Sequence, residues 1–283
     1  MRPAYALTSQ GAIHYAEAGT GEPVLLLHAN PRSHRYFRHV LPLLGARNRA
    51  IAADIPGFGN SHPVPQPASI DGLAECFVRF LDALGIERAH LVGLHTGNKI
   101  AAALAAGWPD RVGTVILAGQ THSLIPDKAG RDAAIRHIVE HYFPQYAEHA
   151  DGAHRIRQWA AVHAEAQGLW WPQRLRTAAR VEAVDIENAE EQVLDFLNGW
   201  RSIVPVYEAI FAFDLEGAMR RVRARTLVLE LQTPEEAHLG EQAEKICALI
   251  PGAQSLTING DGEAFETQPA ALAQAILRFL AEE

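Results

Sequence analysis

The chain has 283 residues, of which 48% are apolar and 20% are charged. This length and composition fit one large α/β domain, or a domain with an insertion, and they exclude a disordered or fibrous protein. The formal net charge of −8 argues against nucleic acid or an anionic membrane as the main partner.

The two cysteines, Cys76 and Cys247, each lie in an apolar helical pattern, so a disulfide framework is not expected. The first residues, MRPAYALTSQG, contain no long apolar run of the kind that signal peptides carry. No stretch approaches the roughly 18 apolar residues of a membrane span. We therefore expect a cytoplasmic protein without a membrane partner, working as a monomer or homodimer.

Short apolar runs alternate with segments of helical periodicity along the first 119 residues. This alternation predicts a parallel sheet that is covered by helices on both faces. The expected strands are 11–19, 24–28, 49–54, 89–93 and 111–119, and the expected helices are 33–45, 69–84 and 96–107.

The pattern changes between residues 120 and 213, where no convincing strand is found and the periodicity is mostly helical. Such an insertion between two sheet strands indicates a lid over one end of the sheet. We expect a core of residues 1–119 and 214–283 with a helical lid of residues 120–213. The core resumes with strands at 225–231 and 253–258 and with helices at 235–249 and 268–281.

A glycine-flanked turn, GLHTG (93–97), joins the expected strand 89–93 to the helix that follows. A turn of this kind lifts the side chain of His95 out of the sheet edge and points the N–H of Thr96 at the same spot. The loop HANP (28–31) can bring the N–H of Ala29 there as well. Two N–H groups aimed at one point stabilise a developing oxyanion, and one such donor is worth on the order of 3 kcal/mol.

Four features in this order resemble the α/β-hydrolase family: HANP (28–31), DIPGFGNS (54–61), the GLHTG elbow (93–97) and the helical insertion. They are most similar to its capped branch, which contains epoxide hydrolases, haloalkane dehalogenases and carbon–carbon bond hydrolases. The resemblance covers essentially the whole chain. It implies a mostly parallel eight-stranded sheet with a helical cap, and a small-molecule substrate bound between them without an organic cofactor.

The family places a nucleophile at the elbow, an acid after a late strand and a histidine near the C-terminus. This chain carries His95 where serine, aspartate or cysteine is expected. The acid after strand 225–231 is best matched by Glu235, with Glu236 next to it.

The C-terminal loop, NGDGEAFETQP (259–269), also departs from the family pattern. Either Glu263 or Gly262 stands where the family has its histidine, and no histidine follows His238. An ordinary Ser–His–acid triad therefore cannot be assembled.

His95 has four interpretations. As a base, it would be oriented by Glu263 or Glu235 beneath the two N–H groups, without a covalent intermediate. As a nucleophile, it would form an acyl- or alkyl-imidazole. As a metal ligand, it would join His28, His122 or Glu263, but these residues show no local spacing signature, and we expect no metal. The last interpretation keeps the fold as a ligand-binding protein without catalysis.

We favour a hydrolase-type enzyme in which His95 acts as base or nucleophile on an ester, carbon–carbon, epoxide or carbon–halogen bond. A cofactor-free lyase, isomerase or decarboxylase is a third class that could use the same oxyanion hole. His28 is expected to hold its loop, and Asn30 either donates to a substrate oxygen or halide or caps the helix 33–45. His122 could face the same pocket as His95. Aromatic side chains of the lid suit an apolar or aromatic substrate.

Overall fold

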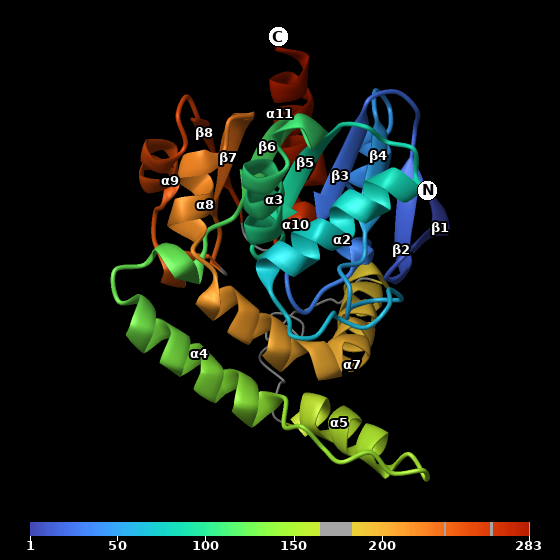
Figure 1. Cartoon of the computed structure of the whole chain (residues 1–283). Helices are drawn as coiled ribbons and strands as arrows, with labels where there is room; N and C mark the ends of the chain where they lie inside the picture. Colours follow the sequence, from blue (N-terminus) through green and yellow to red (C-terminus); the bar gives the residue numbers. More distant parts are fainter. Residues whose placement is uncertain (165–182, 235, 261–262, 283) are drawn as a thin grey trace.

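The computed structural model describes residues 1–164, 183–234, 236–260 and 263–282. Their centre is one eight-stranded sheet with the order β1-β2-β4-β3-β5-β6-β7-β8 (Figure 1). The pairs β1–β2 and β2–β4 are antiparallel, and all later neighbours are parallel, which confirms the mostly parallel eight-stranded sheet. The strands are β1 (Arg2–Thr8), β2 (Gly11–Ala18), β3 (Pro23–Leu27), β4 (Arg49–Ala53), β5 (Ala89–Leu94), β6 (Val112–Ala118), β7 (Arg225–Gln232) and β8 (Gln254–Asn259).

The central strands are continuous apolar runs because helices cover both of their faces. Alternate side chains of β3 enter two separate cores: Leu25 and Leu27 join one, and Leu26 joins the other. The first core contains α2 (Ile70–Ala83), α3 (Thr96–Gly107), α8 (Leu215–Arg221) and α9 (Ala243–Leu249). The second contains α1 (Leu41–Leu44), α10 (Ala264–Thr267) and α11 (Pro269–Ala281), as well as the short 3-10 helix η1 (His34–Phe37).

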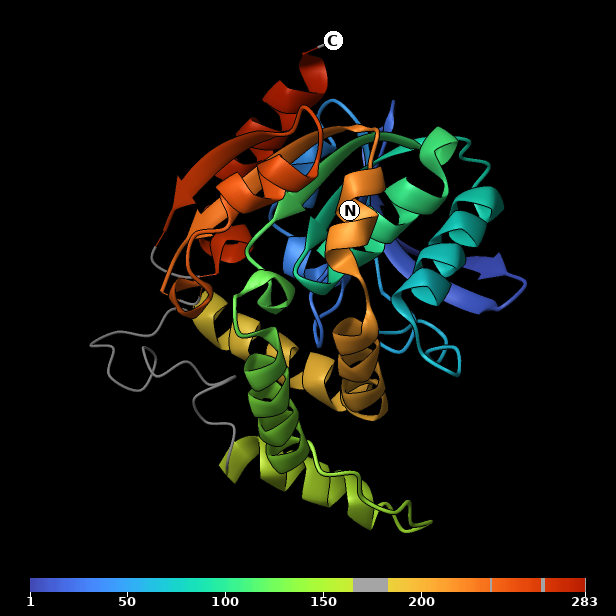
Figure 2. The same cartoon turned by 60° about the vertical axis from the view of Figure 1, so that its left-hand side comes forward.

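The described residues between β6 and α8 are mostly helical, and we call these helices the helical insertion. It begins with the 3-10 helix η3 (His122–Leu124) and continues with α4 (Lys128–Tyr142), α5 (Ala153–Ala164) and α7 (Ala183–Ala212). Figures 1 and 2 both show α4, α5 and α7 together beneath the core. The expected lid, 120–213, includes residues 165–182, which lie outside the described residues, so its bounds stay a prediction.

Local differences from the expected elements have identifiable causes. The edge strand β1 was not expected from the sequence, because its outward side chains are exposed and its pattern is weakly apolar. The expected helix 33–45 is divided into η1 and α1. The expected helix 235–249 begins only at Ala243, because Gly240 takes the left-handed conformation after a short 3-10 turn at Ala237–Leu239.

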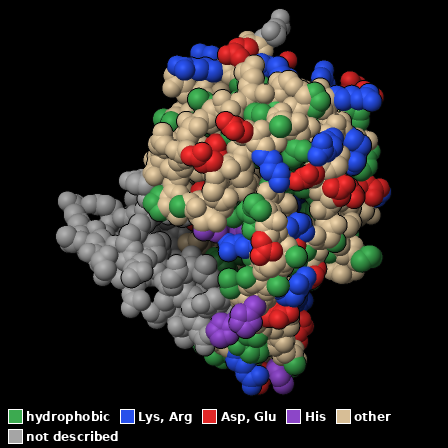
Figure 3. All heavy atoms as spheres, turned by 90° about the vertical axis from the view of Figure 1, so that its left-hand side faces the viewer, with side chains coloured by type: hydrophobic (Ala, Val, Ile, Leu, Met, Phe, Trp, Pro, Cys, Tyr) green, Lys and Arg blue, Asp and Glu red, His purple; other side chains and the backbone are tan. Residues whose placement is uncertain are grey.

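The surface is mixed in charge where Figure 3 displays it, with Lys and Arg side chains interspersed among Asp and Glu. Within the described residues, no helix combines the length and the apolar character needed to cross a membrane.

Candidate active site

His95 occupies the sharp turn between β5 and α3 in a strained backbone conformation, with φ 50° and ψ −97°. It is the non-glycine residue with positive φ among the described residues, and such a conformation costs about 1–3 kcal/mol. The turn is also crowded: a Cβ on Gly97 would lie 2.0 Å from the carbonyl oxygen of Leu27. The elbow geometry that the sequence motif predicts is therefore present, with an imidazole at its tip.

The loop after β3 is bonded directly to the elbow. The Gly97 N–H donates to the His28 carbonyl at 3.1 Å, and the Asn30 N–H donates to Thr96 Oγ1 at 3.2 Å. These bonds hold Ala29 and Thr96 beside each other on the wall of one cavity. The two residues that the sequence assigns to an oxyanion hole thus lie on the same surface as His95.

His28 is completely buried and supports this loop from behind. Its Nδ1–H donates to the Ala29 carbonyl at 2.8 Å, and its Nε2 accepts the Ile55 N–H at 2.9 Å. Burial lowers the pKa of His28 to about 4, so the ring is neutral, as these two bonds require. His28 orients the loop and does not line the cavity.

Both ring nitrogens of His95 face acceptors. Nδ1 lies 2.9 Å from the Gln120 carbonyl oxygen, and Nε2 lies 2.7 Å from Oε1 of Glu236. A carbonyl and a carboxylate can only accept, so the ring carries a proton on each nitrogen. Burial lowers the pKa of His95, but the hydrogen bond and charge of Glu236 and the Gln120 carbonyl outweigh it and raise that pKa above its usual value.

Glu236 follows β7, where the family places its acid. Its side chain is 9% exposed, and its second oxygen, Oε2, accepts the Gln120 N–H at 3.3 Å. Gly119 leaves room for the pair, because a Cβ there would lie 3.2 Å from His95 Cε1 and 3.4 Å from Glu236 Oε1. One imidazolium and one carboxylate are therefore held together beside the elbow.

The two acids favoured from the sequence were Glu235 and Glu263. Glu235 lies outside the described residues. Glu263 accepts a hydrogen bond from the guanidinium of Arg32, which also lies 3.4 Å from Glu266. The structure therefore brings Glu236 to His95 and leaves Glu263 in an ion pair with Arg32. The sequence favoured Glu235 and named Glu236 next to it, and the carboxylate that the structure places at His95 is that of Glu236.

Asn30 is tied to the helical insertion. Its Nδ2 donates to the Ile203 carbonyl of α7 at 3.3 Å, and its buried Oδ1 has no partner among the described residues. The cap of η1 is Ser33, whose side chain accepts the Arg35 N–H at 3.3 Å. Asn30 therefore does not serve as the helix cap, and its unpaired oxygen belongs to a residue of the cavity wall.

Lys99 is a residue that the sequence reasoning missed. It lies one turn after His95 on α3, is 3% exposed, and lines the cavity. Its ammonium donates to Thr121 Oγ1 at 2.7 Å and approaches the His95 carbonyl oxygen at 3.4 Å. Burial lowers the pKa of Lys99 to about 7. The signal available in the sequence was a lone charge in the otherwise apolar helix TGNKIAAALAAG.

His122 faces the same cavity as His95. Its Nδ1 accepts a bond from Nε of Arg131 at 3.2 Å, and its ring centroid lies 5.6 Å from that of His238. Burial lowers the pKa of His122, and the positive charges of Lys99 and Arg131 lower it in the same direction, to about 3. His122 is therefore a neutral acceptor in the wall.

The cavity measures about 410 Å³, a volume that suits a small organic molecule. Its polar end combines the elbow with the loops after β3, β6 and β7. The helical insertion contributes mostly apolar side chains to the lining, together with Arg131 and Gln192; the apolar ones are Ile135, Ile138, Val139, Phe143, Phe196, Tyr207, Ile210 and Phe211. The site therefore combines a charged, proton-bearing group with aliphatic and aromatic side chains.

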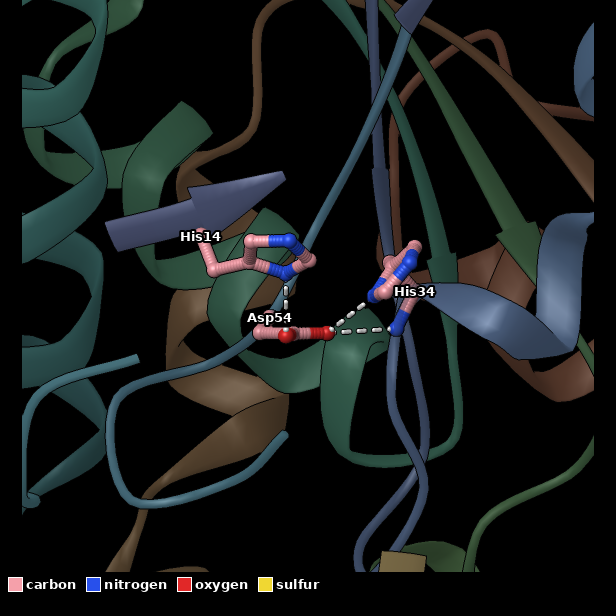
Figure 4. A group of neighbouring side chains, drawn as sticks. All are labelled: His14, His34 and Asp54. Carbon is pink, nitrogen blue, oxygen red and sulfur yellow. Dashed lines mark hydrogen bonds and ion pairs between the residues drawn. The ribbon is translucent and has the colours of Figure 1, made fainter. Parts of the chain in front are cut away.

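A second histidine–carboxylate group, the Asp54 cluster of His14, His34 and Asp54, is outside the residues that line this cavity (Figure 4). Its three side chains have the ligand types and closeness that a metal ion needs. However, Asp54 already accepts four bonds: 2.9 Å from His14 Nδ1, 2.8 Å from His34 Nδ1, 2.7 Å from the His34 N–H and 2.9 Å from the Asn60 N–H. The carboxylate is saturated by donors, so the residues present fit a hydrogen-bonded support better than a metal centre.

Comparison with known proteins agrees with this architecture. A family model described as alpha/beta hydrolase fold matches residues 22–205. The chain is 42% identical over 113 residues to 2-hydroxy-6-oxo-6-phenylhexa-2,4-dienoate hydrolase of Comamonas testosteroni. It is 39% identical over 111 residues to haloalkane dehalogenase 2 of Mycobacterium bovis.

These two alignments cover 38% and 39% of this chain, and each spans 39% of the length of the curated relative. Among solved structures, a thermophilic esterase of Thermogutta terrifontis is similar over 99% of this chain and 98% of its own, with a TM-score of 0.76 and 21% sequence identity. At that identity the likeness concerns the fold alone.

Proposed function

We infer the function from one premise: this chain belongs to the α/β-hydrolase fold family. We propose that it is a hydrolase-type enzyme acting on a small molecule with apolar or aromatic parts. In this proposal His95 and Glu236 replace the family's nucleophile-based set. The observation that carries it is the 2.7 Å contact between His95 Nε2 and Glu236 Oε1 on the wall of the cavity.

The pair offers a proton donor and a proton acceptor side by side. An oxygen of the substrate would lie at the N–H groups of Ala29 and Thr96, where the N-terminus of α3 favours negative charge. Glu236 would accept a proton from the attacking water, its bond to His95 Nε2 would break, and Nε2 would then donate its proton to the leaving group. The proton on Glu236 then returns to His95, which restores the starting state. General acid–base catalysis of this kind contributes about 100- to 10,000-fold.

This route needs no covalent intermediate. Neither ring nitrogen of His95 has a lone pair directed at the cavity, because each is occupied by a protein acceptor. The nucleophilic role is therefore less well supported than the acid–base role. The similarity to 2-hydroxy-6-oxo-6-phenylhexa-2,4-dienoate hydrolase and to haloalkane dehalogenase 2 suggests substrate classes to test.

Binding without turnover is the second candidate. It is favoured by the same double occupancy of the His95 ring, and by Arg32, which holds Glu263 at the loop where the family has its histidine. A pocket so arranged can recognise a ligand oxygen without any chemistry, as the fold alone does not imply activity.

A substrate panel separates the two candidates. Aryl esters, epoxides, haloalkanes and 1,3-diketones are assayed with the wild-type protein and with His95→Gln, using the exposed His137→Gln on α4 as the matched control. We expect turnover of at least one class, lowered about 100-fold or more by His95→Gln and unchanged by His137→Gln. Absence of turnover across the panel, combined with measurable binding by calorimetry, would establish the binding role instead.

A further inference from the structure

The sequence contains three lysines, and one of them is placed unlike the others. Lys128 pairs with Asp132 at 2.6 Å, and Lys245 pairs with Glu216 at 3.0 Å; both are partly exposed. Lys99 is buried in the cavity wall and forms no salt bridge within the described part of the chain. Its protein contacts are a hydroxyl and a carbonyl, which do not hold the amine in its charged form as a carboxylate would.

The groups around the Lys99 amine come from three elements. The elbow contributes His95, which is already paired with Glu236. The helix η3 contributes His122, whose ring is held neutral. From α4, the charge of Asp132 raises the pKa of Lys99 and that of Lys128 lowers it, but burial is the larger effect and leaves the amine titrating near 7.

We propose that Lys99 is an amine nucleophile that forms an imine with an aldehyde or ketone bound in the cavity. Buried lysines in apolar pockets are activated in this way because desolvation disfavours the ammonium. This inference names a substrate class, carbonyl compounds, and rests on the proposed function only for the cavity being the substrate site. It assigns Lys99 a catalytic role that the His95–Glu236 proposal does not contain.

The step balances without any further reactant. The neutral Nζ attacks the carbonyl carbon, and a C–N bond forms as the C=O π bond becomes a C–O bond. The carbinolamine oxygen takes the two amine hydrogens as protons and leaves as water. The product is a C=N double bond to Lys99, which hydrolysis returns to the amine and the carbonyl compound.

Borohydride trapping tests this directly. The full chain is incubated with benzaldehyde at pH 8, reduced with sodium borohydride, digested and mapped by mass spectrometry. With a pKa near 7, Lys99 holds roughly 200 times more neutral amine at this pH than an ordinary exposed lysine does. Since a less basic amine is also a weaker nucleophile, we expect benzylation of Lys99 to be about tenfold faster than that of Lys128 or Lys245.

Two variants and a pH series sharpen the result. Lys99→Met should lose the adduct, whereas Lys245→Arg should retain it at the same position, with melting curves confirming that both variants fold. The trapping rate at Lys99 should rise as pH increases through about 7 and then level off. Peptide mapping of the wild-type protein decides the question even where Lys99→Met does not fold.

An adduct distributed over Lys128, Lys245 and the N-terminus, without preference for Lys99, would overturn the inference. The assay is independent of hydrolysis. Trapping at Lys99 without turnover in the substrate panel would remove the proposed hydrolase function and leave the imine chemistry. Turnover in the substrate panel without trapping at Lys99 would support the hydrolase function and overturn the imine chemistry.

Discussion

Among the described residues, the Asp54 cluster and the His95–Glu236 pair each join histidine to a buried carboxylate. Asp54 has no exposed surface and accepts four hydrogen bonds, from His14, His34 and Asn60. His95, by contrast, has a strained backbone, and 32% of its side-chain surface is exposed on the cavity wall. The same residue types therefore form a fully hydrogen-bonded structural group in one region. In the other they form a proton donor and acceptor that a ligand in the cavity can contact.

The contrast shows which features separate a structural site from a chemical one. A buried carboxylate and short histidine–carboxylate distances are common to both groups. Strain and access to a cavity are found only at the elbow, and strained backbone clusters at functional sites. The following variants test this distinction, beginning with the largest expected effect.

Asp54→Asn should weaken the fold strongly. Burial raises the pKa of Asp54, but the bonds from His14 and His34 outweigh it and hold that pKa well below its usual range, so the folded state depends on the charged form. Replacing one carboxylate oxygen by an NH₂ group sets donor against donor in a buried site. We expect a loss of about 3–5 kcal/mol in unfolding free energy, measured by urea denaturation.

The exposed Asp110→Asn is the matched control and should change stability by less than about 0.5 kcal/mol. Turnover per folded molecule should be unchanged in both variants. If Asp54→Asn were as stable as the wild type but inactive, the assignment of the Asp54 cluster to a structural role would be wrong.

Glu236→Gln should affect the other region in the opposite manner, changing chemistry more than stability. The amide can still bond to His95 Nε2, but the negative charge that raises the pKa of His95 is lost. The pKa of His95 should therefore fall, and any activity that needs the imidazolium should be lost at a lower pH than in the wild type. NMR titration of the His95 ring measures the shift directly, with the exposed His137 as internal reference.

We expect the turnover of Glu236→Gln to fall about 100-fold, because the acceptor of the water proton is removed. An unchanged His95 titration curve would mean that the 2.7 Å contact does not control the protonation state of the ring.

Much of this architecture follows from periodicity. The central strands and α3 are long or strongly patterned, and their expected ranges agree with β3, β5, β6 and Thr96–Gly107 to within a residue or two. The edge strand β1 is outside this rule, because it is exposed and stabilised mainly by pairing with β2. The apolar pattern of a segment predicts its strand reliably where helices bury both faces of that strand.

The site was less accessible to sequence reasoning. The motif located His95, Ala29 and Thr96, since a glycine-flanked turn fixes its own geometry. The sequence favoured Glu235 as the acid after β7, whereas the carboxylate beside His95 in the structure is that of Glu236, which precedes a 3-10 turn. Lys99 was missed because its burial depends on residues that are distant in sequence, including those of the helical insertion that line the same cavity.

Another buried carboxylate, that of Asp195 on α7, extends the comparison with Asp54. It is 3% exposed, its Oδ1 has no hydrogen-bond partner among the described residues, and Arg35 lies 3.7 Å away. Burial therefore raises the pKa of Asp195 to about 6, although Arg32, Ser33 and Arg35 oppose the shift. The pKa values of two buried aspartates, Asp54 and Asp195, thus shift in opposite directions. The number of hydrogen bonds that each carboxylate accepts accounts for the difference.

The sign of the stability effect follows from this raised pKa. In the unfolded chain Asp195 ionises near 3.8, so the folded state binds the proton more tightly and loses stability as pH rises from about 4 to 6. Asp195→Asn removes that loss and should stabilise the protein by up to about 3 kcal/mol at pH 7, with little effect at pH 4. Urea denaturation at both pH values measures it. A destabilised Asp195→Asn at pH 7 would show that the ion pair with Arg35 outweighs the desolvation of the carboxylate, and Asp195 would then resemble Asp54.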